Sequence, residues 1–390
     1  MIVVEFVFWL SVTSLVYNYV GFPILMKLLS IGKKQNEVCF TKEDNLPMVS
    51  VLLAAYNEES VIEEKIKSTF KTNYPLAKLE LMIGSDASTD GTDDIIKKYK
   101  RLFPNVKFKR FGGRTGKPTI IDDLKKHASG ELLIMTDANV FFDHDTVFQL
   151  VKHFKNQKIG LVGGNILNVD VKNDGISKQE KQYLSIENKI KYQEGVLWGT
   201  VIGAFGGAFA IRKSACVDVP NNFIVDDFFL TMSVIEQGKF AINELDAIAY
   251  EDVSHVMTKE FTRKKRIAAG NFQNLNRFKH LLFPPTTGLA FSFWSHKVLR
   301  WKGPFFMLFA LISNVLLLQE SVVYEYLFAG QVIFWMIPLF DFVLGKLGIH
   351  NKLLRFVSHL FGMNLALLLG FFTYLGGVKT NVWTPTERNQ

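Results

Sequence analysis

Apolar residues in this 390-residue chain gather in two blocks, one at each end. In the first block, 2–29, only Glu5 and Lys27 are charged. At about 1.5 Å per residue, the stretch 6–25 matches a bilayer core of about 30 Å. A secretory signal peptide would carry basic residues before the apolar run and a small-residue cleavage site after it, whereas here the basic residues follow. We therefore predict an uncleaved N-terminal transmembrane helix over 1–30, with the next domain in the cytoplasm.

The second apolar block contains three runs, which are 304–318, 326–344 and 353–375. They predict a C-terminal transmembrane region over 303–377 with about three spans, followed by a tail over 378–390. The first loop of this region is acidic and the second is basic, which favours an outside position for the first and an inside position for the second. The tail carries two basic residues, so the side of the C-terminus stays open.

A segment just before the second block mixes aromatic and basic residues. The run 289–301 combines Phe and Trp with Lys297 and Arg300. This mixture is typical of an amphipathic helix that lies in the membrane interface, and we predict one over 284–302. A buried helix of the polar domain is the alternative.

The region 45–280 alternates short apolar runs with amphipathic ones. The strand-like runs are 48–57, 79–88, 106–111 and 131–139. The helix-like runs between them are 60–70, 92–102 and 119–128. This alternation predicts an α/β domain with a mostly parallel, Rossmann-like sheet and helices on both faces. Ligands of such sheets bind at the carboxyl ends of the strands.

Composition narrows the class of protein. Hydrophobic residues make up 48% of the chain, which excludes a disordered protein, and two cysteines exclude a disulfide scaffold. The net charge is +8, but the basic residues cluster beside the apolar blocks and near the candidate site. We therefore predict contacts with membrane lipids and an anionic substrate, and no nucleic-acid partner.

Several acidic residues lie in short motifs, two of which directly follow predicted strands. Asp86 lies in "GSDASTDGT", Asp137 in "TDAN", and Asp226 with Asp227 in "IVDDFFL". A single Asp at such a place is usually a turn former or a helix cap. Together they supply what a nucleotide-diphosphate sugar requires: a polar contact for base and ribose, a carboxylate for a divalent cation, and a base for the incoming hydroxyl.

These motifs give the stretch 49–275 a resemblance to the family 2 glycosyltransferases, which have the GT-A fold. "AAYNEESVIEEKI", "SDASTDGT", "RTGKPTIID", "TDAN" and "VDDFFL" follow that family's order, and "RKKRI" takes the place of its QxxRW. The flanking apolar helices also resemble the membrane-embedded branch, which includes hyaluronan, chitin and cellulose synthases. This chain departs from the pattern at Ala55, where Pro is common, at Asn139 in the DxD motif, and at Arg263 and Ile267, which replace the Gln and Trp of QxxRW.

The resemblance implies roles for residues on the donor side. Asn57, Glu58 and Asp86 would contact the uridine or ribose, and Lys117 would offset the nucleotide charge. Glu58 as a helix-opening residue and Lys117 as a solvated side chain are the simpler alternatives.

The cation and the diphosphate are assigned by the same resemblance. Asp137 and Asn139 would hold Mg²⁺ or Mn²⁺, and Arg266 would support the diphosphate. His255 is a distant candidate for the metal.

On the acceptor side, Asp227 is the candidate general base, and repulsion from Asp226 would raise its pKa toward a useful value. Gly206 and Gly207 would let the backbone approach an acceptor sugar, with Arg263 nearby, although a close-packed strand turn accounts for the two glycines equally well. A base placed opposite the leaving group implies inversion at the anomeric carbon. The expected enzyme transfers a sugar from a UDP-sugar, with UDP-GlcNAc and UDP-glucose as leading donors, to a glycan at the membrane.

Two alternatives remain open from the sequence. The enzyme would transfer a single sugar to a polyprenyl-phosphate or other lipid-linked acceptor, a reading favoured by the absence of the Trp at Ile267. More remotely, the chain would be a non-catalytic carbohydrate-binding scaffold. In the main reading it is a multi-pass protein of a bacterial inner or plasma membrane, engaged in polysaccharide synthesis or secretion.

Overall fold

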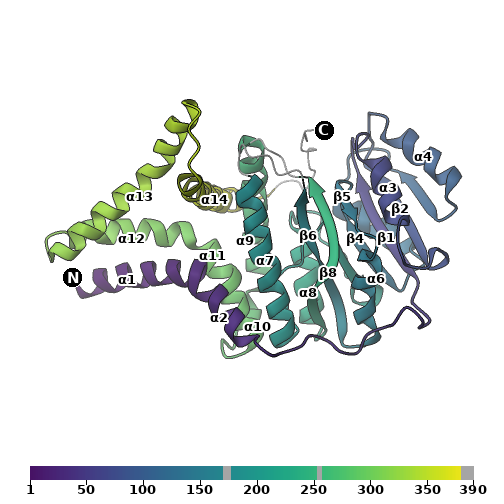
Figure 1. The fold of residues 1–390 in the computed structure, drawn as a ribbon, viewed down its shortest axis with the longest axis horizontal. Coiled ribbons are helices and arrows are strands. Elements are labelled where there is room, and N and C mark those ends of the chain that lie inside the picture. The colour runs from purple at the N-terminus through teal and green to yellow at the C-terminus, as the bar shows by residue number, and fades with distance from the viewer. Residues whose placement is uncertain (170–176, 253–256, 379–390) are drawn as a thin grey trace.

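The computed structural model describes residues 1–169, 177–252 and 257–378. One sheet of eight strands, in the order β3-β2-β1-β4-β7-β6-β8-β5, forms the centre of the polar domain, and apolar helices extend from one end of that domain (Figure 1). The strands are β1 (Val49–Ala55), β2 (Leu79–Ser85), β3 (Val106–Arg110), β4 (Leu132–Thr136), β5 (Val140–Phe142), β6 (Ile159–Val169), β7 (Ala208–Arg212) and β8 (Phe240–Asp252).

Helices cover both faces of this sheet. In the polar domain they are α3 (Ile62–Phe70), α4 (Thr92–Leu102), α5 (Lys117–His127), α6 (Thr146–Val151), α7 (Ser177–Trp198), α8 (Asp226–Glu236) and α9 (Met257–Phe278). The predicted helix 92–102 coincides with α4, and the other predicted helices and strands differ from the observed ones only at their ends.

The first four strands form a parallel half-sheet. β1 pairs in parallel with β2 and β4, and β2 pairs in parallel with β3. The other half is mixed, because β7 is antiparallel to β4 and β6, β5 is antiparallel to β8, and β6 is parallel to β8. The prediction of a mostly parallel sheet therefore describes the first half only. The strand–helix alternation is interrupted after β4, since β5 follows within a few residues and without a crossover helix.

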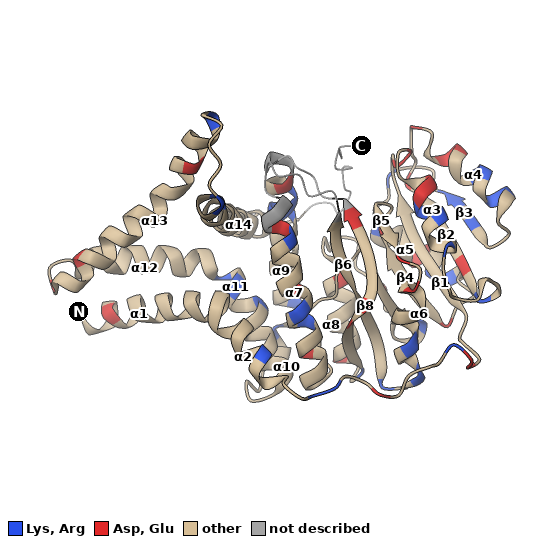
Figure 2. Cartoon of the chain, in the orientation of Figure 1, with Lys and Arg blue, Asp and Glu red and all other residues tan. Residues whose placement is uncertain are grey.

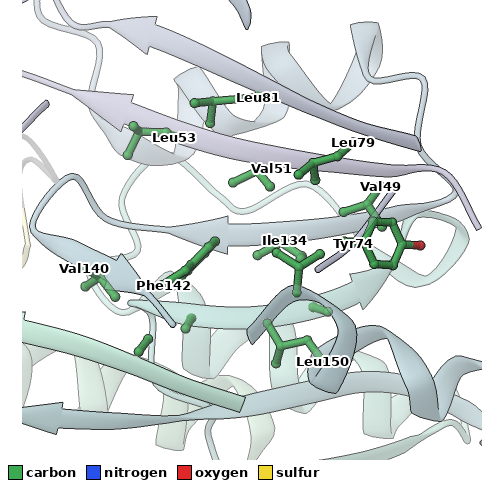
Figure 3. Packing of buried hydrophobic residues seen from close by; sticks show 14 of the residues in the cluster. Val49, Val51, Leu53, Tyr74, Leu79, Leu81, Ile134, Val140, Phe142 and Leu150 are labelled. Atoms are coloured by element: carbon green, nitrogen blue, oxygen red, sulfur yellow. The ribbon is translucent and has the colours of Figure 1, made fainter. Parts of the chain in front are cut away.

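Both faces of the parallel half-sheet are buried. Along β1, Val51 and Leu53 face one apolar cluster, which includes Ile134, whereas Leu52 faces the other. Figure 3 shows side chains of neighbouring strands packed together in the first cluster. Continuous apolar strands of this kind are typical of parallel sheets with helices on both sides. This packing fixes the carboxyl ends of β1, β2 and β4 at one edge of the domain.

Apolar helices make up the rest of the structure. They are α1 (Ile2–Val16), α2 (Phe22–Leu29), α12 (Gly303–Leu317), α13 (Val322–Lys346) and α14 (Lys352–Leu375). Among the described residues, three helical stretches, 2–29, 322–346 and 352–375, are long and apolar enough to cross a membrane, and α12 is shorter. Figure 2 shows that α1, α12 and α13 carry few charged residues.

Helix α14 packs closely against α9 of the polar domain. A Cβ placed on Gly370 of α14 would lie 2.4 Å from Cβ of Ala268 and 2.8 Å from the carbonyl oxygen of Lys265. Only a glycine allows the two helices to approach this closely. A second link, in which Asn364 Nδ2 donates to the hydroxyl of Tyr19 at 3.0 Å, ties α14 to the N-terminal helix.

The segment predicted as an interfacial helix has a different environment from the expected one. It forms α10 (Gly288–Ser292), a π-helical turn (Phe293–Val298) and α11 (Leu299–Trp301). Lys297 is 8% exposed, and both Lys297 and Arg300 form ion pairs with Glu187 of α7. Both basic side chains are thus paired with a buried carboxylate more than a hundred residues earlier in the chain, as the alternative of a buried helix would have it. The position of this segment at the membrane interface stays a prediction.

Candidate active site

A cavity of about 440 Å³ opens at the carboxyl end of β4, where α5, α8, α9, α11 and α14 meet. Its lining includes most of the residues that the sequence singles out, namely Glu58, Lys117, Asp137, Asn139, Gly206, Gly207, Asp226, Asp227, Arg263 and Arg266. The fold thus brings together side chains from segments up to about 200 residues apart in the chain.

Lys117 joins two of the candidate acids. It follows Gly116, whose φ of 87° favours glycine, and begins α5. Its Nζ lies 2.8 Å from Oδ1 of Asp137 and 3.7 Å from Oδ2 of Asp226. Burial lowers the pKa of Lys117, but the charges of Asp137 and Asp226 outweigh burial and the pKa is raised. The ammonium group therefore stays charged between the ends of β4 and α8.

Asp227 has the environment of a general base. Burial raises its pKa to about 6, the neighbouring charge of Asp226 adds to the effect, and Lys117 opposes it. A carboxylate with a pKa near the working pH is suited to accept a proton. Asp227 Oδ1 also accepts a hydrogen bond of 2.7 Å from the backbone nitrogen of Phe228, so the residue supports the first turn of α8 as well.

Gly206 packs directly against this carboxylate. A Cβ at Gly206 would lie 2.8 Å from Asp227 Oδ2, closer than side-chain carbons normally approach an oxygen. The next residue, Gly207, faces Val140, and its Cβ would lie 2.8 Å from a methyl carbon of that side chain. The glycine pair therefore leaves room beside Asp227.

The residues that would hold a metal ion form an open set of oxygen ligands. The Asp137 side chain is 41% exposed, and Asn139 Nδ2 donates to Glu251 Oε1 at 3.2 Å, which leaves the carbonyl oxygen of Asn139 as the ligand atom. Within residues 1–169, 177–252 and 257–378, no group of three His, Cys, Asp or Glu side chains is arranged to hold a metal ion. One carboxylate and one amide oxygen fit a hard cation that takes its remaining ligands from phosphate and water. His255 lies outside the described residues.

Asp86 and Asn57 do not line this cavity. Asp86 is fully buried and accepts hydrogen bonds from the backbone nitrogen of Thr115 at 2.6 Å and from Arg114 Nε at 3.0 Å. Asn57 has a φ of 53°, and its side chain accepts a 2.8 Å hydrogen bond from the backbone nitrogen of Thr89. Asn57 thus joins the loops that follow β1 and β2, whereas Asp86 joins the loop that follows β2 to the one that follows β3. Their predicted contacts with the nucleoside remain predictions.

The two arginines of α9 differ in their pairing. Arg263 forms two 3.0 Å hydrogen bonds with the carboxylate of Glu260. Arg266 forms no ion pair or side-chain hydrogen bond with any described residue, although it lines the cavity. Burial lowers the pKa of Arg266, and the charge of Arg263 lowers it further. Arg266 is thus a cavity-lining guanidinium with no partner in the part of the chain that is described.

A buried polar network beside the cavity escaped the sequence-based interpretation. Glu187 and Glu194 of α7 hold His296, whose Nε2 and Nδ1 lie 3.0 and 2.7 Å from their carboxylate oxygens. Lys191 lies on the same face of α7, with its Nζ 3.1 Å from the centre of the Phe205 ring. The spacing 187, 191 and 194 is the available signal, because residues three and four apart share one face of a helix.

The polar domain has a GT-A glycosyltransferase fold. The loops that hold Asn57 and Asp86 follow strands of the parallel half-sheet, and the candidate base and the glycine pair adjoin the mixed half-sheet. The solved structure of the mannosyltransferase PcManGT from Pyrobaculum calidifontis, in complex with GDP-Man and Mn²⁺, has the same fold, with a TM-score of 0.74, 19% identity, and coverage of 95% of this chain and 99% of that one.

Part of the chain matches a known family model. Residues 50–219 match the model of Glycosyl transferase family 2. A poly-beta-1,6-N-acetyl-D-glucosamine synthase of Staphylococcus epidermidis is 29% identical over 216 residues, which cover 55% of this chain and 49% of that protein. A beta-monoglucosyldiacylglycerol synthase of Nostoc is 27% identical over 193 residues, covering 48% of this chain and 41% of that protein. The chain thus spans about half the length of the curated relatives it matches.

Proposed function

We propose that this protein is an inverting glycosyltransferase that moves a hexosyl group from a UDP-sugar to a hydroxyl of a glycan acceptor at the membrane. The proposal rests on the environment of Asp227 in the cavity. Its carboxylate has a pKa of about 6 and shares one cavity with the Lys117–Asp137 pair and the unpaired Arg266. A base and two cations around one cavity meet the needs of a reaction in which a hydroxyl attacks and a diphosphate leaves.

In the proposed reaction, Asp227 takes the proton of the acceptor hydroxyl as its oxygen bonds to the anomeric carbon. The bond from that carbon to the diphosphate breaks on the opposite face, so the configuration inverts. Lys117 and Arg266 stabilise the negative charge that develops on the diphosphate. Asp137 and Asn139 would hold Mg²⁺ or Mn²⁺, which neutralises part of the diphosphate charge when it is bound.

The position of the cavity supports an acceptor at the membrane. Its lining continues from Asp227 to Trp301 of α11 and to Met363, Ala366 and Leu367 of α14, an apolar helix long enough to cross a bilayer. We propose a multi-pass arrangement in which the GT-A domain lies in the cytoplasm, at a bacterial inner or plasma membrane. The product would be a polysaccharide that is synthesised or secreted there.

A second candidate is the transfer of one sugar to a polyprenyl-phosphate or other lipid-linked acceptor. It is favoured by Ile267, which lines the cavity where the resembling family has a Trp, and by the apolar side chains of α14 in the same cavity. One relative is named a glycolipid synthase and another a polymer synthase, so both acceptors have support. The same names favour UDP-GlcNAc and UDP-glucose as donors.

A donor screen tests these proposals. The full chain in membranes is incubated with radiolabelled UDP-GlcNAc, UDP-glucose or GDP-mannose and with Mg²⁺ or Mn²⁺, and products are separated by gel and by organic extraction. High-mass product supports polymerisation, and a single product in the organic phase supports lipid transfer. Activity that survives EDTA contradicts the metal assignment. No turnover and no nucleoside-diphosphate release with any donor contradicts both enzyme proposals and leaves the non-catalytic scaffold.

A further inference from the structure

Lys191 is a buried cation without a partner. It lies on α7, is 2% exposed, and forms no hydrogen bond or ion pair with any residue of the described part of the chain. The two carboxylates nearest to it along the helix are already engaged. Glu187 binds Lys297 and Arg300, and Glu194 binds His296 and the backbone nitrogen of Ile202. An unpaired ammonium group in the interior is destabilising, so an apolar residue would be more stable at this place.

The contact that Lys191 does make leads to the candidate base. Its Nζ lies 3.1 Å from the centre of the Phe205 ring, close enough for a strong cation–π interaction. Phe205 lines the cavity, and the next residue, Gly206, approaches Asp227 so closely that a Cβ would lie 2.8 Å from Oδ2. Lys191 therefore supports the short segment 205–206 that packs against the base.

We propose that Lys191 is a positioning residue for sugar transfer, which holds the 205–206 segment against Asp227 and favours the ionised form of that carboxylate through its charge. The inference rests on the proposed function, since it needs Asp227 to act as the base. It adds α7 to the elements that control the reaction, although the Lys191 side chain is absent from the lining of the cavity.

The charges around Asp227 indicate why Lys191 matters. From its own helix Asp227 faces Asp226, and from α5 it faces Lys117. The other charged groups that line the same cavity are Glu58, Asp137, Glu180, Glu251, Glu260, Arg263, Lys264, Arg266 and Arg300. On the α7 side, Lys191 lowers the pKa of Asp227 and thereby opposes burial.

Lys191 is itself influenced by its surroundings. Burial lowers its pKa to about 7 and the charge of Lys297 lowers it further, whereas Glu187, Asp227 and Glu194 raise it. Asp227 is thus an anion that helps to keep Lys191 charged, and Lys191 is a cation that helps to keep Asp227 ionised.

The test measures kcat against pH in the full chain, for the wild type and for Lys191→Met, Lys191→Arg and Lys189→Met. Lys189 is an exposed residue of the same helix and serves as the matched control. In Lys191→Met, the pH at which activity reaches half its maximum on the acidic side should rise by about half a unit or more, because Asp227 loses a favourable charge. The donor KM should change less than kcat. Lys191→Arg keeps the charge, so the acidic limb of its pH–activity profile, meaning the fall in activity toward low pH, should lie at the wild-type pH. The same is expected of Lys189→Met.

Two results would overturn the inference. An acidic limb of Lys191→Met at the wild-type pH, with activity reduced equally at all pH values, would mean that the residue only fills space. An acidic limb of Lys191→Arg shifted to higher pH would mean that the charge at position 191 has no role. This variant decides the matter if Lys191→Met does not fold. Wild-type protein without turnover on any nucleotide sugar would instead refute the proposed function, and the inference with it.

Discussion

Gly206 offers a perturbation of the base that leaves every charged group in place. Gly206→Ala adds one methyl group, whose ideal position is 2.8 Å from Asp227 Oδ2. An ordinary carbon–oxygen contact is longer by about half an ångström, so either the carboxylate or the loop must move by that amount. Overpacking of this kind costs about 1–3 kcal/mol.

The displacement falls on the carboxylate of Asp227, the proposed general base. Misplacing a catalytic group by a fraction of an ångström to one ångström costs roughly 10- to 100-fold in rate. We therefore expect Gly206→Ala to lower kcat by about that factor while the affinity for the UDP-sugar changes little, because the residues proposed to bind the donor are other ones. The assay is the initial rate of UDP release, together with donor binding and thermal unfolding.

Gly330→Ala is the control for the substitution itself, because no atom lies within 4 Å of a Cβ at that position of α13. Folded Gly206→Ala protein with the wild-type kcat would refute the placement of this backbone against the base. A loss of donor affinity equal to the loss of kcat would indicate that the loop contacts the donor instead.

Three further predictions concern other parts of the molecule. Lys117→Met removes a cation that lowers the pKa of Asp227, so the acidic limb of the pH–activity profile should move above pH 6 and the donor KM should rise. Gly370→Ala should force α14 away from α9 and lower the unfolding temperature, whereas Gly362→Ala on the same helix, with no atom within 4 Å of its Cβ, should have little effect. Burial raises the pKa of Glu244, but adjacent imidazole, backbone and ammonium donors outweigh it and hold the pKa at about 2, below the ordinary 4.5. This stabilisation is present above pH 4.5 and is lost as the pH falls through 2, so Glu244→Gln should cost up to about 3 kcal/mol of unfolding free energy at pH 7 and far less at pH 2.

The sequence predicts a helix or a strand well where the pattern that specifies it lies within that one segment. Helix α4 has the predicted ends because its apolar residues recur at helical spacing and Gly91 precedes it. The carboxyl ends of β1, β2 and β4 were predictable for the same reason, and with them the placement of Asp137. The mixed order of the later strands was not predictable in this way, since pairing between β6, β7 and β8 depends on contacts between distant segments.

The candidate site was also predictable from the sequence only in part. The motifs predicted that Lys117, Asp137, Asp227 and Arg266 serve one site, and the fold places them around one cavity. They did not predict that Asp86 would be held by Arg114 and Thr115, because that contact depends on the path of the chain after β3.

The ion-pair partner of Lys297 was not predictable from the sequence for a related reason. Periodicity shows that Lys297 is a charge on an apolar helix, but its ion pair with Glu187 spans 110 residues of sequence. No pattern within a single segment contains that information.

The central claim is that Asp227 removes the acceptor proton, and the substitution Asp227→Asn tests it most directly. The amide cannot serve as a base, and general base catalysis contributes about 100- to 10,000-fold to a rate. We predict that transfer falls by that factor while the UDP-sugar is still bound with an affinity within a few-fold of wild type. Asp94→Asn, at a side chain of α4 that is 85% exposed, should leave both quantities unchanged. Transfer by folded Asp227→Asn protein at a rate close to wild type would contradict the account.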